Sequence, residues 1–126
     1  SILNQGLAFL KANSSLENLD FTHMKRGFDL EGIQYLRDSL KRLRIMSSKK
    51  VDNIQLISEL HNLEWLILSD SVPLESSRVL ESLRNLEALT LRGSSYFIDG
   101  DLRALEKRRE SIKYYNIAHK SHYVYK

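Results

Sequence analysis

The most regular feature of the sequence is a nine-residue pattern of apolar and variable positions that occurs five times. Leucine occupies the first, fourth and sixth positions of the copies that begin at Leu63 and Leu86, and the copy at Leu40 differs only by isoleucine in the sixth position. Two outer copies begin at Leu16 and Ile112, so the five starts are separated by 24, 23, 23 and 26 residues. Near-constant spacing over this length indicates an internal repeat.

Each copy predicts a short strand with one buried face, because apolar residues alternate with variable residues at the third, fifth and seventh positions. The segments between copies have helical spacing. Apolar residues at 51, 54, 57 and 60 share one face of such a helix, and Asp52 is expected to cap its N-terminus. A strand, a crossover helix and a second strand require parallel pairing. The pattern therefore predicts an α/β fold, a right-handed coil with a parallel sheet inside and helices outside.

With these motifs the chain resembles the leucine-rich-repeat family over residues 16–120. The resemblance implies a horseshoe-shaped solenoid of about five repeats, with the sheet on the concave face and the helices on the convex face. Such proteins usually have asparagine at the ninth position, where this sequence has Ser48, Ser71 and Ser94. A serine hydroxyl cannot span two backbone groups as an amide does, so we expect a weaker ladder of hydrogen bonds.

The whole chain is expected to form a single domain with distinct ends. Residues 1–15 contain Ile2, Leu3, Leu7, Phe9 and Leu10, which predicts a helix that caps the first repeat. The repeats occupy 16–120, and the charged stretch 106–110 is expected to be solvated. The tail, 121–126, either continues the last strand or folds back over its open edge.

The family's geometry places the third, fifth and seventh positions of each copy on the concave face. The third-position column is Asn18, Arg42, Trp65, Ala88 and Tyr114, and the fifth-position column is Asp20, Arg44, Ile67, Thr90 and Asn116. The seventh-position column is Thr22, Met46, Ser69, Arg92 and Ala118. The residues expected to bind a partner are Arg42, Arg44, Met46, Trp65, Ile67, Ser69, Thr90, Arg92, Tyr114 and Asn116.

Trp65 and Ile67 are the informative members of these columns, because large apolar side chains that face outward usually mark a contact site. Arginine surrounds them, and tryptophan, tyrosine and arginine are enriched at binding hot spots. Two alternatives remain open. In the first alternative, the N-terminal segment or the C-terminal tail covers Trp65. In the second, Trp65 lies in a contact between copies of the chain.

Composition narrows the classes of function further. The 126 residues include 19 basic and 16 acidic side chains, a net charge of +3, which makes a nucleic-acid partner unlikely. With no cysteine there is neither a disulfide nor a thiolate metal site. No apolar run is long enough to insert into a membrane, and the start lacks the features of a signal peptide. Together these features lead us to expect a cytoplasmic protein.

Nothing in the sequence predicts catalysis, a cofactor or a small-molecule substrate. The common nucleophile, phosphate-loop and metalloprotease motifs are absent. His119 and His122 lack the further ligands that a zinc site needs, and Asp99 and Asp101 fit loop capping better than acid–base chemistry. We therefore expect a non-catalytic module that binds a protein partner, by analogy in a bacterial immunity or effector-binding role. The alternative is a structural or scaffolding segment of a larger repeat protein.

Overall fold

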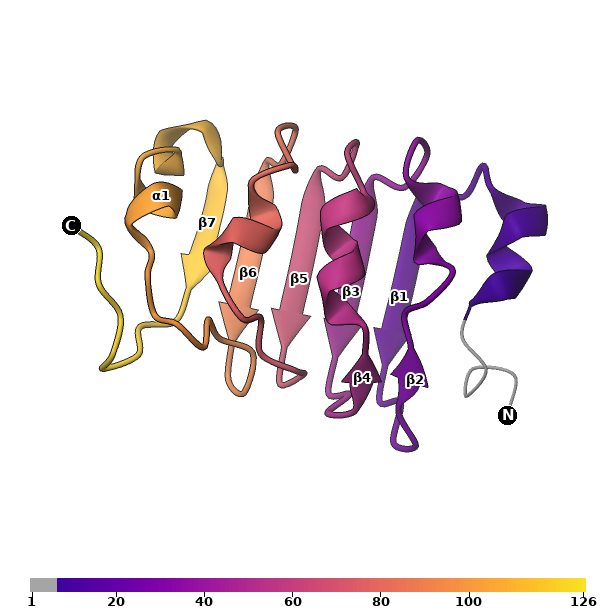
Figure 1. The fold of residues 1–126 in the computed structure, drawn as a ribbon, viewed down its shortest axis with the longest axis horizontal. Coiled ribbons are helices and arrows are strands. Elements are labelled where there is room, and N and C mark those ends of the chain that lie inside the picture. Colours follow the sequence, from indigo (N-terminus) through magenta and orange to yellow (C-terminus); the bar gives the residue numbers. More distant parts are fainter. Residues whose placement is uncertain (1–6) are drawn as a thin grey trace.

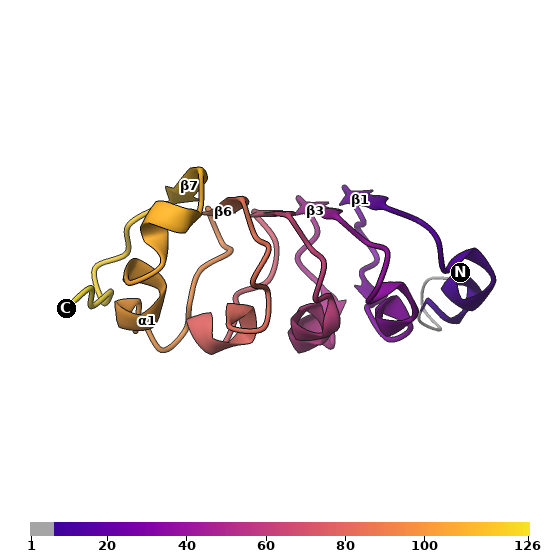
Figure 2. The same ribbon diagram turned by 90° about the horizontal axis from the view of Figure 1, so that it is seen from above.

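The computed structural model describes residues 7–126, which form an α/β structure built on one five-stranded parallel sheet (Figure 1). The strands lie side by side in the order in which they occur along the chain. They are β1 (Asn18–Thr22), β3 (Arg42–Met46), β5 (Trp65–Ser69), β6 (Ala88–Arg92) and β7 (Tyr114–Ile117). The α/β class and the parallel pairing predicted from the sequence are confirmed. Seen along the sheet, the row of strands is only shallowly curved (Figure 2).

Every strand begins at the third position of its nine-residue pattern, and the register keeps equal positions side by side. Trp65 lies between Arg42 on β3 and Ala88 on β6. The predicted third- and fifth-position columns are therefore confirmed along the whole sheet. Within the sheet, the seventh-position column ends at Arg92 on β6. Its expected last member, Ala118, lies one residue beyond the end of β7.

The segments that connect the strands all cover one face of the sheet (Figure 2). Most are short 3-10 helices, namely η3 (Ile33–Leu36), η4 (Ile54–Glu59), η5 (Ser77–Leu80) and η6 (Arg109–Ser111), and α1 (Arg103–Glu106) is α-helical. Two short strands, β2 (Phe28–Asp29) and β4 (Val51–Asp52), pair in parallel with each other; in the chain, β2 precedes η3 and β4 precedes η4. We call one strand of the main sheet together with the segment that leads to the next strand a unit.

The longer amphipathic helices expected between the strands are therefore corrected to 3-10 turns. Residues 47–64 must return the chain along the full length of a strand, and a 3-10 helix advances about 2.0 Å per residue against about 1.5 Å for an α-helix. The expected N-cap is also wrong. Asp52 belongs to β4, and Asn53, with a φ of 61°, precedes η4 without a side-chain cap.

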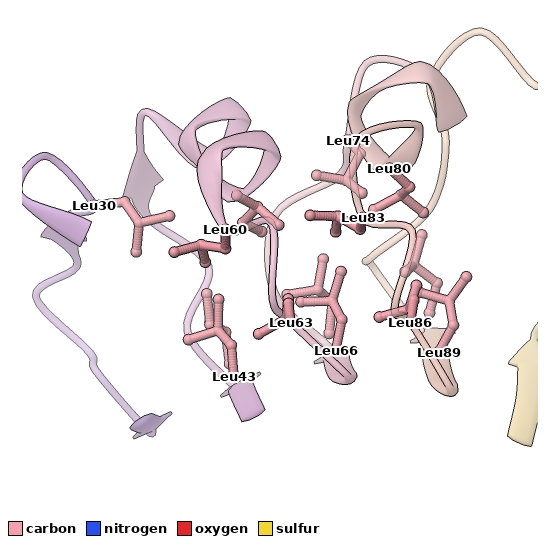
Figure 3. Close-up of a cluster of buried hydrophobic side chains, with 14 of the residues drawn as sticks. Leu30, Leu43, Leu60, Leu63, Leu66, Leu74, Leu80, Leu83, Leu86 and Leu89 are labelled. Atoms are coloured by element: carbon pink, nitrogen blue, oxygen red, sulfur yellow. The ribbon is translucent and has the colours of Figure 1, made fainter. Parts of the chain in front are cut away.

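The hydrophobic core fills the space between the sheet and the helical layer. The fourth-position residues Leu43, Leu66 and Leu89 are buried, and leucines from the connections meet them from the other side (Figure 3). At the N-terminal end, the 3-10 helix η2 (Ala8–Asn13) packs beside η3, and Leu7 and Leu10 are buried there. The first six residues of the predicted cap, with Ile2 and Leu3, lie outside the described residues.

Serines at the ninth position link neighbouring units through the backbone. The Ser71 hydroxyl donates to the carbonyl oxygen of Ser48 at 2.7 Å, and the Ser94 hydroxyl donates to that of Ser71 at 3.0 Å. The N–H of Ser71 donates to the Ser95 hydroxyl at 2.9 Å. Two adjacent serines thus divide between them the donor and acceptor roles that one amide side chain can combine.

The chain reverses direction after each of the first four strands through a left-handed residue at the eighth position of the pattern. The φ angles are 59° at His23, 51° at Ser47, 50° at Asp70 and 64° at Gly93. Only glycine adopts this conformation without steric cost. Three of the four units therefore hold a side chain in a conformation that the fold imposes.

At the C-terminal end, the tail folds against the preceding unit. Val124 pairs in parallel with Asp101, and the buried Tyr123 hydroxyl accepts a hydrogen bond of 3.0 Å from the N–H of Phe97. The charged stretch 106–110 is only partly solvated, because the half-buried Arg108 guanidinium donates to the carbonyl oxygens of Leu80 and Leu83 at 2.9 and 2.6 Å. Burial lowers the pKa of Arg108 from its ordinary value.

Candidate binding surface

The face of the sheet opposite the helices carries the third-, fifth- and seventh-position side chains, and we call it the outer face. Burial alternates along the strands, so that in β5 the fourth and sixth positions are buried while the others are partly open. The structure brings all of the sequence-predicted site residues together on this face. They are Arg42, Arg44 and Met46 on β3, Trp65, Ile67 and Ser69 on β5, Thr90 and Arg92 on β6, and Tyr114 and Asn116 on β7.

Trp65 is the first residue of β5, the middle strand of the sheet, and is half-buried. The guanidinium carbon of Arg42 lies 4.6 Å from the centre of the Trp65 ring, in the arrangement of a cation–π contact. The ring of Tyr114 approaches from the other side, with its centroid 6.4 Å away and its plane tilted by 55°. Side chains of β3 and β7 therefore cover part of Trp65. At the two ends of the described chain, η2 packs beside η3, and Tyr123 of the tail packs against Phe97.

Ala88 explains how Trp65 and Tyr114 meet, because it lies between them on β6. It is an outward residue, yet only 6% of it is exposed, whereas Tyr114 is 65% exposed. The two rings lean together over the small methyl group. Arg42, Trp65 and Tyr114 form a continuous group across the sheet, which we call the aromatic cluster.

The fifth-position column contains an ion pair that the predicted site did not include. Asp20 on β1 accepts a hydrogen bond of 2.8 Å from Nε of Arg44, and a second one from Nη2. The hydrogen bond from Arg44 is the largest cause that lowers the pKa of the Asp20 carboxyl. Asp20 therefore neutralises Arg44, one of the residues expected from the sequence to bind a partner. The signal was available, because the two residues are neighbours in the same column.

A hollow of about 340 Å³ opens beside Trp65 on the β1 side of the outer face. Its polar lining comes from Asn18, Asp20, Arg42 and Arg44, and its apolar lining includes Trp65 and Ile67. An apolar side chain can contact Ile67 and the Trp65 ring there, while polar groups next to it reach the arginines or the Asn18 amide.

The remaining predicted residues extend the surface toward β7. Nη1 of Arg92 donates to the Asn116 side-chain oxygen at 3.1 Å. Thr90, Met46 and Ser69 are half-buried, and Met46 and Ser69 continue the seventh-position column from Arg92 across β5 to β3. The described ion pairs include neither Arg92 nor Arg42, so both cations keep their charge without an acidic partner in residues 7–126.

Side chains with catalytic potential are held in structural contacts at the C-terminal end. Nδ1 of His119 lies 2.7 Å from the Tyr125 hydroxyl, and Nε2 of His122 lies 2.9 Å from the carbonyl oxygen of Phe97. In the described part of the chain, no three histidine or carboxylate side chains gather to hold a metal ion. None of the helices between residues 7 and 126 has the length and apolar character to cross a bilayer.

Comparison with known proteins gives no match: no family model, no curated protein and no solved structure is significantly similar to this chain.

Proposed function

We propose that the chain is a non-catalytic leucine-rich-repeat module that binds a protein partner through its outer face. The repeated pattern and its strand register support the first part. The aromatic cluster carries the second part, because it joins a half-exposed Trp65 to a largely exposed Tyr114 and to Arg42. These are the residue types that dominate binding energy at protein interfaces.

The chemistry around the cluster favours a partner with an apolar side chain flanked by acidic groups. The hollow beside Trp65 offers apolar contact with Ile67. Arg42 lines this hollow, Arg92 lies on the next strand beside Ser69, and Asp20 already neutralises Arg44. Complementary charge at the rim of an interface increases the association rate and excludes unsuitable partners.

The test compares binding of one captured protein by the parent chain and by Trp65→Ala. Truncation of an anchor typically costs about 2–4 kcal/mol of binding free energy, so affinity should fall roughly tenfold or more. The melting temperature should hardly change, because Trp65 lies outside the core. The matched control is Arg78→Ala, an exposed residue of η5 on the opposite face, which should leave affinity unchanged. Loss of binding by Arg78→Ala alone would place the partner on the helical face.

A structural or scaffolding role is the second candidate. The edge of β7 that pairs with no further strand of the main sheet favours it. Tyr115 and Ile117 are half-buried, whereas their counterparts on β6, Leu89 and Leu91, are buried. A neighbouring domain that stacks on β7 would cover them. In that case Ile117→Ser would abolish association while Trp65→Ala would leave it intact.

A further inference from the structure

A second charged surface lies away from the outer face, at the edge where β1 and β3 end. The edge segments 22–28 and 45–51 contain Lys25, Arg26, Lys49 and Lys50 but no aspartate or glutamate. All four cationic side chains are exposed. The corresponding segment of the next unit, 68–74, is different, because it contains Asp70 and no cation. The positive edge is therefore confined to the first two units, whose end loops lie side by side (Figure 1).

The backbone holds the two cationic loops unusually close together. Gly27 has a φ of 77°, and a Cβ atom added to it would lie 2.4 Å from the carbonyl oxygen of Lys50. The N–H of Phe28 donates to that same oxygen at 2.9 Å. Phe28 pairs with Val51, and Arg26 and Lys49 line the same hollow between the two loops. Only glycine at position 27 permits so close an approach of the two loops. The glycine therefore allows the cations of one loop to lie near those of the other.

The four cations of this edge outnumber the two carboxylates, Asp29 and Asp52, that line the hollow with them. None of the four cations takes part in an ion pair within the described residues. Oδ1 of Asp29 accepts hydrogen bonds from the Asn53 amide and the Glu31 N–H, both 2.8 Å long, which orient this carboxylate toward neutral donors. Like charges on adjacent strands destabilise a fold unless a counter-ion joins them. The arrangement therefore favours the binding of an anion.

The hollow between the loops has a volume of about 420 Å³, large enough for a small ligand. Its lining includes three cations, Arg26, Lys49 and Lys50, and two carboxylates, Asp29 and Asp52. The remaining lining residues are Gly27, Phe28, Val51 and Val72. We propose that this hollow binds a ligand with two or more linked phosphate groups. The planar fork of Arg26 matches two oxygens of one phosphate, and the lysine ammonium groups act as point charges for the next. Several clustered cations select a polyphosphate over a single carboxylate, because each further anionic group finds its own partner.

The test is calorimetric titration of the chain with inorganic tripolyphosphate at low ionic strength. The variant Arg26→Gln/Lys49→Ser/Lys50→Ser removes three charges and retains every Cβ atom. Its affinity should be at least about tenfold lower, since three of the contacts to phosphate are lost. The control Arg84→Gln/Lys107→Ser/Lys113→Ser removes the same charge from exposed positions elsewhere and should change affinity by less than about twofold, as expected for distant charges.

Thermal melting separates a binding role from a structural one. Tripolyphosphate should raise the melting temperature of the parent but not of the triple variant, because a ligand stabilises only the state that binds it. Without ligand, the triple variant should melt no lower than the parent, since like-charge repulsion has been relieved. A lower melting temperature without ligand, no tripolyphosphate binding by the parent, or an equal loss in the control would each overturn the proposal.

The source of the phosphates is identified with two further probes. Retention on phosphatidylcholine vesicles that contain a phosphoinositide bisphosphate, lost in the triple variant, would identify a lipid headgroup. Binding of a soluble inositol polyphosphate without vesicle retention would identify a free metabolite. Tighter binding of a single-stranded oligonucleotide than of tripolyphosphate, through the same residues, would contradict the proposal and indicate a nucleic-acid site.

Discussion

The ring of Tyr114 lies 6.4 Å from the ring of Trp65, although strand β6 separates the two strands that carry them. Adjacent strands are about 4.8 Å apart, so upright rings two strands apart would be separated by about 9.6 Å. The rings lean toward each other because Ala88, between them, is too small to keep them apart. The aromatic cluster therefore depends on a residue that contributes little contact area of its own.

Replacement of Ala88 by leucine should separate the two rings. Trp65 would become more exposed, so its fluorescence emission should move to longer wavelength, and partner affinity should fall about as much as in Trp65→Ala, roughly tenfold or more. The control Ala88→Ser is close to alanine in size and should preserve both properties. Unchanged emission and affinity in Ala88→Leu would mean that contact between the rings is unimportant for the surface.

Truncation of Leu89 to alanine should destabilise the whole chain. Leu89 is a buried fourth-position residue between two neighbouring units, and loss of such a side chain costs about 2–5 kcal/mol. Chemical denaturation should show one cooperative transition at a lower midpoint, because each unit is stabilised by its neighbours. Thr90→Ala, on the outer face of the same strand, should change stability by less than about 0.5 kcal/mol. Equal melting of Leu89→Ala and the parent would refute the assigned register.

Replacement of Gly93 by alanine should destabilise the loop after β6. Its φ is 64°, and an added Cβ atom would lie 1.9 Å from Oδ1 of Asp70, so we expect a cost of about 1–3 kcal/mol. The reverse change, Ser47→Gly at the equivalent position, should stabilise the chain slightly, because the gain from relieved strain exceeds the loss of unfolded-state entropy. Differential scanning calorimetry of both variants measures these opposite shifts.

Replacement of Arg108 by methionine should destabilise the last unit. The methionine keeps much of the apolar stem but removes the charged donor from the carbonyl oxygens of Leu80 and Leu83, which then keep only the backbone N–H groups of Leu83 and Leu86. Hydrogen bonds to a charged group contribute about 1.5–3 kcal/mol. Arg109→Met provides the comparison, because Arg109 is exposed and makes a surface ion pair with Glu106. Similar denaturation midpoints for the two variants would show that the Arg108 hydrogen bonds do not stabilise the fold.

The Asp20–Arg44 pair should respond to acid. Since Arg44 lowers the pKa of Asp20, the stability from this pair is complete above the ordinary aspartate pKa of about 3.9 and is lost as the pH falls through the lower value of the folded chain. Both side chains are exposed, so the effect on unfolding should be small. NMR titration of the Arg44 Nε–H signal should follow this transition, and Asp20→Asn should abolish it. A signal that titrates alike in both chains would assign the transition to another group.

The strands and their register could be predicted because alternation fixes which side chains face the core, and the spacing fixes which strands are neighbours. The helix type could not be predicted with the same argument. Apolar residues at 54, 57 and 60 are three apart, a spacing that suits one face of a 3-10 helix as well as an α-helix. The length of chain available for the return path decides between the two.

The composition of the outer face was predicted more fully than its interactions. Columns derived from spacing list the residues of a surface, but they do not say which members pair. Asp20 and Arg44 meet because opposite charges occupy adjacent strands, whereas Trp65 and Tyr114 meet across an intervening strand. The contact between Trp65 and Tyr114 depends on the small size of Ala88. A pattern of charged and apolar positions does not reveal such an effect of side-chain size.

The serine hydrogen bonds between units have a consequence for the order of folding. The Ser71 hydroxyl completes a bond to Ser48, 23 residues earlier, and Ser94 completes one to Ser71 over the same separation. Each unit therefore needs only the next unit to satisfy its edge, not a distant part of the chain. During synthesis on the ribosome, such a chain can gain structure step by step from its N-terminus, each newly emerged segment locking the one before it.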